Sequence, residues 1–224
     1  RDLSMLSLFG TWEIPTMPLA VTLPALGWVV RGSLDLRRHN RRQQGRAFAN
    51  GQFILIRREL WQGLGGHAAV ASSVLDDVKL ATVVRENGGR NGMMWAPWGF
   101  RVLAYSSVSD LFEGYRKNFH EGMGRNLFSS VAASLIVAII CVVPVAAIAT
   151  GLLQDDDLLR DTGFLGYGAQ TVYRLILERR DGRSGVVAPV HWCAGIFVAV
   201  VMSASAFSKR VVWKGRTFDH GTAQ

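Results

Sequence analysis

Two adjacent carboxylates, Asp76 and Asp77, are the residues of this sequence best suited to acid–base chemistry. They open the stretch Leu75–Asn87, whose apolar spacing predicts an amphipathic helix. Carboxylates at that place complement the positive end of the helix dipole, which is worth roughly 0.3–1 kcal/mol each. A carboxylate can also take the proton of a hydroxyl group while its oxygen attacks. A structural and a catalytic interpretation of the pair both stay open.

The run Gly65, Gly66 and His67 follows a predicted short helix, Arg57–Leu64. Glycines at such a place end a helix and begin a turn, or they let the backbone approach a ligand closely. His67 alone predicts no metal site, because no second ligand stands at metal-binding spacing. The triplet Asp155–Asp157 lies between apolar runs, which indicates a solvated loop. We therefore expect no metal ligands in this chain.

These candidate residues lie in a segment, residues 47–127, that reads as a water-soluble α/β portion. Phe53–Ile56 is a continuous apolar run typical of a buried strand, and Trp95–Tyr105 predicts strand and turn. Ser109 is the predicted N-cap of a long amphipathic helix that runs directly into an apolar span and lies along the bilayer surface. Its apolar stripe consists of Leu111, Tyr115, Phe119, Met123 and Leu127.

Two uncharged runs in the region 128–208 predict membrane-spanning helices, residues 131–153 and 186–207. Each reaches the length of about 20 apolar residues that a bilayer requires. The shorter run 164–177 contains Arg174, so it is a third span, a re-entrant piece or an interfacial helix. The number of spans and the side of the basic tail, residues 209–224, stay open.

Residues 1–46 combine prolines with a strongly basic linker. Three prolines within Ile14–Val30 argue against a straight spanning helix and favour broken segments at the membrane interface. The linker Arg31–Arg46 is predicted to meet anionic lipid. Aromatic residues that would stack on bases are not interleaved with it, so we expect no nucleic-acid partner.

Composition supports a membrane protein and excludes other classes. The 224 residues carry a net charge of +8, with a mean hydropathy of +0.18 and a pI near 10.2. The apolar content excludes a disordered chain, and the two cysteines, both in apolar runs, exclude a disulfide scaffold. A transporter is disfavoured because the two clear spans carry no ionisable residue at mid-depth. The chain begins at Arg1 without a signal-peptide pattern, and we expect it to be the C-terminal part of a longer protein.

Several short stretches of this sequence follow one another in a characteristic order: Thr11–Pro15, Ala49–Glu59, Gly65–Val70, Val74–Ala81, Tyr105–Ser107, Gly114–Phe119 and Val212–Phe218. In this order they resemble the C-terminal half of a membrane-bound family 2 glycosyltransferase of the GT-A type. Its relatives glycosylate lipids such as carotenoid acids, hopanoids or ceramide. The expected fold is therefore α/β, an incomplete GT-A-like portion, followed by C-terminal transmembrane α-helices.

The resemblance implies roles for particular residues. Asp77 takes the place of the family's catalytic base, and Asp76 stands where the family usually has Glu. Lys117 and Asn118 fall near the place of a Gln-x-x-Arg-Trp motif, which processive relatives use and this sequence lacks. Its absence favours transfer of one sugar per acceptor. The residues implied to line the sugar and acceptor side are Gly51, Gln52, Gly65, Gly66 and His67.

The implied activity is an inverting transfer of a sugar from a nucleotide-sugar, with UDP-sugars expected, to a lipid acceptor. The resemblance places the Mg²⁺ or Mn²⁺ site of the donor diphosphate in the N-terminal half, upstream of Arg1, so the 224 residues alone are expected to be inactive. It also implies a multi-pass protein of the inner or plasma membrane with a cytoplasmic catalytic part. The alternative is a non-catalytic anchor or scaffold of a polysaccharide or lipid export system.

Overall fold

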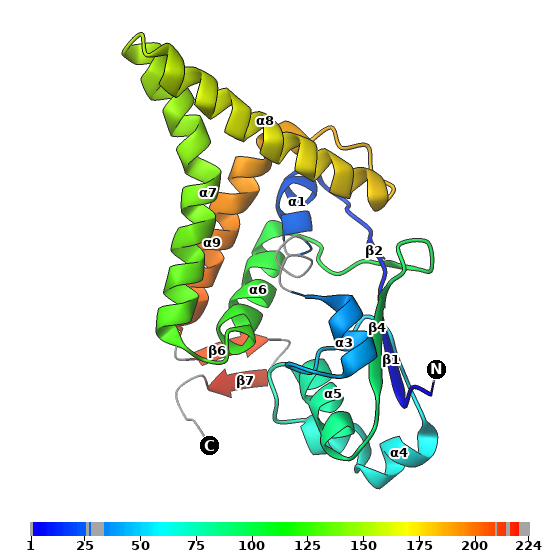
Figure 1. The fold of residues 1–224 in the computed structure, drawn as a ribbon. Coiled ribbons are helices and arrows are strands. Elements are labelled where there is room, and N and C mark those ends of the chain that lie inside the picture. Colours follow the sequence, from blue (N-terminus) through cyan, green and yellow to red (C-terminus); the bar gives the residue numbers. More distant parts are fainter. Residues whose placement is uncertain (1, 26, 28–33, 209, 214–215, 220–224) are drawn as a thin grey trace. The chain divides into compact units, whose positions relative to one another are not determined.

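The chain divides into two compact units. The computed structural model describes residues 2–25, 27, 34–208, 210–213 and 216–219. Arg1–Glu13 and Val29–Ala104 form one unit, here called the sheet unit, and Ile14–Trp28 with Tyr105–Gln224 form the other, the helical unit (Figure 1). The first 13 residues thus group with the α/β segment, whereas the proline-rich segment groups with the apolar helices.

A three-stranded mixed sheet organises the sheet unit. The strand β1 (Met5–Phe9) lies in the middle, antiparallel to β3 (Ile54–Ile56) and parallel to β4 (Asn91–Trp95). A two-residue parallel ladder joins β2 (Thr11–Trp12) to β5 (Arg101–Val102). Because β1 and β4 are parallel, the chain between them must cross over, and this crossover carries the candidate site.

The crossover supplies the helices of the sheet unit: α3 (Leu36–Arg42), α4 (Arg58–Gly63), the 3₁₀ helix η1 (Gly66–Val70) and α5 (Asp76–Glu86). The predicted strand and the two predicted helices around the candidate site are confirmed within one residue. The expectation that this strand is buried was wrong, because Leu55 is 61% exposed and Ile54 and Ile56 are only half-buried. The core joins one face of β1 to α5 through buried apolar side chains, namely Met5, Ala47, Ala49, Val70, Leu80, Ala81 and Val84.

Side chains of α3 and of the residue after it bind the free edge of β4. The Asn40 side chain donates to the Met93 carbonyl and accepts from the Met93 N–H, each at 2.8 Å. The Gln43 side chain does the same for Asn91, at 2.8 and 2.9 Å. These amides take the place of a further strand, so the edge of β4 is closed to pairing with another chain.

His39 lies at the centre of the polar contact between α3 and α5. Its side chain is buried, 3.0 Å from the Arg85 guanidinium and 3.2 Å from the Asn91 amide nitrogen. Burial, and then the positive charge of Arg85, lower the pKa of His39 from 6.5 to about 4. The imidazole is therefore neutral at physiological pH.

Acid should weaken the sheet unit through His39. His39 takes up a proton near pH 6.5 in the unfolded chain but only near pH 4 in the folded one. The free energy of unfolding is therefore highest above pH 6.5 and decreases as the pH falls from 6.5 to about 4. The loss reaches at most about 3 kcal/mol. His39→Gln should reduce the change in the thermal unfolding midpoint between pH 6.5 and pH 4, and the control His67→Gln should show the same change as the wild type. Equal slopes in the wild type and His39→Gln would contradict the assignment.

The helical unit contains α1 (Met17–Thr22), α6 (Val108–Gly122), α7 (Leu127–Leu153), α8 (Asp157–Arg180), η2 (Ala188–Val190) and α9 (His191–Phe207). A two-stranded antiparallel ladder of β6 (Arg210–Trp213) and β7 (Arg216–Asp219) follows. Lys214 and Gly215, within the last stretch of the family resemblance, lie outside the described residues.

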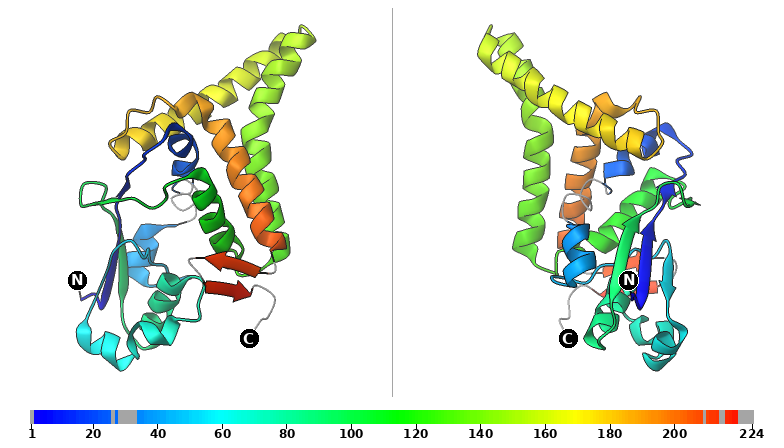
Figure 2. Two further views of the ribbon diagram at one scale, coloured as in Figure 1. Left: turned by 180° about the vertical axis from the view of Figure 1, so that it is seen from behind. Right: turned by 45° about the vertical axis from the view of Figure 1, so that its right-hand side comes forward.

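Among the described residues of this unit, two helices are long and apolar enough to span a membrane: Leu127–Leu153, and Ala188–Phe207, which includes η2. Both expected spans are thus helical. The helices α7 and α9 pack side by side (Figure 2) through small residues. The Ser134 hydroxyl donates to the Ala199 carbonyl at 2.7 Å, and a Cβ on Gly195 would overlap the Cys141 sulfur. Small and hydroxylated residues at helix contacts are typical of membrane proteins.

The third expected apolar run, residues 164–177, belongs to α8. This helix is not among those apolar enough to span a membrane. Its Arg174 is buried and donates to the carbonyls of Ala20 and Val21 in α1, at 2.9 and 3.1 Å. The same guanidinium lies 3.4 Å from the buried Glu178 carboxylate. A cation at the end of α1 complements the negative end of that helix, so Arg174 ties α8 to the proline-rich segment.

The predicted start and end of α6 were wrong. The hydroxyl of Ser107, rather than Ser109, caps the helix by accepting from the Asp110 N–H at 3.1 Å. The helix ends at Gly122, and a turn with left-handed backbone at Gly124 and Arg125 precedes α7. The four-residue apolar spacing continues through this turn, so periodicity alone did not reveal it. Leu111, Tyr115 and Phe119 are buried as the stripe predicts.

Gly163 marks a close backbone contact between α8 and α7. A Cβ there would lie 2.8 Å from the Ile148 nitrogen and 2.9 Å from the Pro144 carbonyl oxygen. We expect Gly163→Ala to destabilise the protein by about 1–3 kcal/mol through overpacking. The control Gly168→Ala, with nothing within 4 Å of its Cβ, should be neutral or stabilising. Thermal unfolding in detergent compares the two, and equal midpoints would argue against this helix contact.

Candidate active site in the sheet unit

The first turn of α5 carries both predicted acids. Asp76 is exposed and its carboxylate accepts from the Asp77 N–H at 3.0 Å. Asp77 is half-buried and its Oδ1 accepts from the Val78 N–H at 2.8 Å. Such bonds to backbone at a helix start are what a dipole-complementing carboxylate makes. They fix the orientation of the Asp77 side chain and leave its Oδ2 directed elsewhere.

Asp77 also binds a loop far away in the sequence. The Gly51 N–H donates to its Oδ2 at 2.7 Å, across 26 positions of the sequence. A Cβ on Gly51 would lie 3.4 Å from the same oxygen, an ordinary van der Waals distance, so the loop packs directly against the carboxylate. The contact joins two of the predicted site segments into one arrangement.

The loop that carries Gly51 is itself held by β1. The Ser7 hydroxyl donates to the Asn50 carbonyl at 3.0 Å and accepts from the Asn50 N–H at 2.7 Å. The Asn50 side chain then accepts from the Gln52 N–H at 3.1 Å. Sequence analysis missed Asn50, although an Asn that accepts from the residue two positions on is a familiar turn signal.

The predicted substrate residue Gln52 has a structural hydrogen bond. Its Oε1 accepts from the Gly10 N–H, at the end of β1, at 3.2 Å. This bond commits the amide oxygen of Gln52 to the sheet, whereas the backbone of Gly51 faces Asp77. Of the two neighbouring residues, Gly51 thus lies at the carboxylate and Gln52 positions the loop.

Gly65, Gly66 and His67 form a second part of the site region, between α4 and η1. Both glycines have left-handed backbone, with φ of 83° and 65°. The Trp61 indole N–H donates to His67 Nδ1 at 3.1 Å. Because an indole can only donate, His67 carries its proton on Nε2. Trp61, which the sequence did not single out, therefore fixes the tautomer of this exposed histidine.

Lys117 and Asn118 lie in α6, within the helical unit, and both are half-buried. The structure therefore brings together Gly51, Gln52, Asp76 and Asp77. It places the Gly65–His67 turn in the same unit, where η1 contacts α5. Lys117 and Asn118 belong to the other unit.

No described part of the chain holds a group of three His, Cys, Asp or Glu side chains that could bind a metal ion. Asp76 and Asp77 alone do not make up such a set. The Mg²⁺ or Mn²⁺ implied by the resemblance therefore finds no ligand set among the described residues.

Comparisons of the chain with protein-family models, with curated proteins and with solved structures found no match. The family resemblance therefore depends on the order of the short stretches and on the residues they bring together.

Gly66 should be required for the turn for steric reasons. It is buried, its φ is 65°, and a Cβ would lie 2.9 Å from the Trp61 ring. We expect Gly66→Ala to cost about 1–3 kcal/mol of unfolding free energy. The control is Gly63→Ala at the end of α4, where a Cβ meets nothing within 4 Å. Denaturant or thermal unfolding measures both, and a neutral Gly66→Ala would refute a steric role.

Proposed function

We propose that this chain carries the acceptor side of the catalytic centre of an inverting membrane glycosyltransferase. The enzyme moves one sugar from a nucleotide-sugar to a lipid acceptor. The observation that carries the proposal is the hydrogen bond from the Gly51 N–H to the Asp77 carboxylate. It unites the stretches Ala49–Glu59 and Val74–Ala81, two separate parts of the family resemblance, at the residue expected to be the base.

The proposed reaction uses Asp77 as a general base. The acceptor hydroxyl attacks the anomeric carbon of the donor sugar, and its proton passes to the Asp77 carboxylate. A carbon–oxygen bond forms on one face of that carbon while the bond to the nucleotide diphosphate breaks on the other. The configuration is thereby inverted, and the diphosphate leaves with the bonding electrons. Hydrogen bonds from Gly51 and Val78 orient the carboxylate for this step.

A lipid acceptor suits the two candidate spans. The helix α7 exposes many apolar side chains, among them Leu135, Ile136, Ile139 and Ile140, each more than half exposed. An apolar surface of this extent is suited to lipid contact. A protein anchored in this way meets acceptors that are dissolved in the same bilayer, while a nucleotide-sugar reaches it from water.

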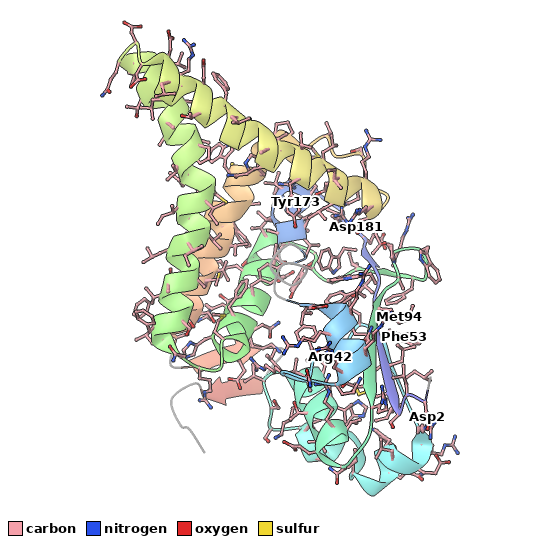
Figure 3. All side chains as sticks on the ribbon, in the orientation of Figure 1. Asp2, Arg42, Phe53, Met94, Tyr173 and Asp181 are labelled. Carbon is pink, nitrogen blue, oxygen red and sulfur yellow. The ribbon has the colours of Figure 1, made fainter. Side chains whose placement is uncertain are left out.

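One face of the sheet offers a surface for the donor-binding half that the resemblance implies. Leu55 of β3 and Met94 of β4 are 61% and 48% exposed, on the face opposite the buried Met5, Ser7 and Phe9. Phe53 and Met94 are labelled in Figure 3. Sheets in α/β proteins carry a layer on each face. A further α/β portion would cover this face and hold the donor with its Mg²⁺ or Mn²⁺.

The competing proposal is a non-catalytic membrane anchor or scaffold. It is favoured by the bonds of Asp76 and Asp77 to neighbouring backbone N–H groups, since these bonds also occur where acids merely complement a helix dipole. The two proposals differ in whether the charge of Asp77 is needed for transfer.

Replacing Asp77 should remove transfer and retain the fold. In Asp77→Asn the single amide oxygen can still accept from Gly51, and the bond from the Val78 N–H is given up. The base is lost, so we expect the rate to fall about 10²–10⁴-fold. The assay follows labelled sugar from UDP-glucose, then from a panel of other nucleotide-sugars, into extracted lipid. Membranes containing the complete protein are used, with Mg²⁺ and Mn²⁺ supplied.

Glu86→Gln is the matched control, because it removes an exposed carboxylate from the other end of the same helix. It should leave the rate within about twofold of the wild type, as surface changes usually do. Normal turnover in Asp77→Asn would reject the base assignment. No transfer from any donor in the wild type would favour the anchor.

A further inference from the structure

Four arginines of α3 gather on one groove of the sheet unit. Arg37, Arg38, Arg41 and Arg42 line it together with Asp35, and it encloses about 470 Å³. All four arginines are exposed, and Arg42 is labelled in Figure 3. Among the described residues that line the groove there is no aromatic side chain, which argues against stacking on nucleic-acid bases.

The opposite side of α3 is fixed to the sheet. His39 is buried, and Asn40 and Gln43 bind the backbone of β4. These contacts hold the helix against rotation, so the four guanidinium groups share one outer surface. A helix this short would not be stable in isolation, and its anchors therefore determine where the positive charges stand.

The charges of the groove are not neutralised within the described residues. None of the ion pairs found there involves these four arginines. The Asp35 carboxylate accepts from the Arg38 backbone N–H at 3.0 Å, as the N-cap of α3. Arginines four positions apart, such as Arg38 and Arg42, repel each other along a helix. An anion in the groove would relieve this repulsion.

We propose that the α3 groove binds the headgroup of an anionic phospholipid. Guanidinium groups bind phosphate through paired, charge-assisted hydrogen bonds. A lipid is the favoured source of that phosphate because the same chain contains two helices able to span a membrane, and basic clusters next to such helices bind anionic lipid. In the sequence, α3 follows closely on the segment Ile14–Trp28, which groups with those helices. The proposal does not depend on sugar transfer.

The test measures lipid binding by the purified full chain in a non-ionic detergent. Fluorescent short-chain phosphatidylglycerol is titrated and its anisotropy recorded, with phosphatidylcholine as the neutral comparison. We expect Arg38→Gln combined with Arg42→Gln to weaken phosphatidylglycerol binding by about 30-fold at low ionic strength, at about fivefold per arginine. Phosphatidylcholine binding should not change.

Arg58→Gln combined with Arg101→Gln is the matched control, since both residues are exposed in the sheet unit and the charge change is the same. It should stay within about twofold of the wild type. Equal losses in the two pairs would mean that only net charge matters, and unchanged binding in the α3 pair would also overturn the proposal. Inorganic phosphate and UDP serve as competitors. Displacement of the lipid by either at micromolar concentration would assign the groove to a soluble phosphate instead.

Discussion

The reciprocal hydrogen bonds between Ser7 and the backbone of Asn50 are the interaction on which the candidate site depends. Ser7 is completely buried in the central strand of the sheet, and its hydroxyl both donates to and accepts from one residue of the loop. A buried hydroxyl without these partners would be costly, so strand and loop fix each other. The loop in turn sets the Gly51 N–H against Asp77.

At the edge of the sheet formed by β4, side chains again bind backbone groups. Buried backbone groups need partners, and the side-chain amides of Asn40 and Gln43 supply them along the edge of β4 that faces away from β1. This pairing brings α3 to the sheet and leaves its arginines outside. One requirement, the satisfaction of backbone hydrogen bonds, thus accounts for both the closed edge and the basic groove.

Hydrophobic patterns in the sequence predicted the strands and helices whose apolar residues follow one another at regular spacing. The apolar run Phe53–Ile56, the amphipathic stretch of α5 and the uncharged lengths of α7 and α9 each have a direct signature. The turn after Gly122 escaped because an apolar spacing of four continued through it. Asp76 and Asp77 were identifiable by type. Gly51 entered the predicted site only through the family resemblance, since its contact with Asp77 depends on a strand pairing that no short pattern encodes.

The sheet unit and the helical unit use different kinds of side chains in their internal contacts. In the sheet unit, the buried polar side chains of Ser7, His39 and Asn91 bind backbone groups or each other. In the helical unit the α7–α9 contact uses hydroxyls and small residues, the kind of contact that helices in lipid use because apolar burial provides no driving force between them there. A catalyst that joins a water-soluble donor to a lipid requires both kinds of surface in one chain. The separation of charged and apolar residues in this sequence is what the proposed reaction requires, and in that proposal the Asp77 carboxylate, oriented by Gly51 and Val78, is the base.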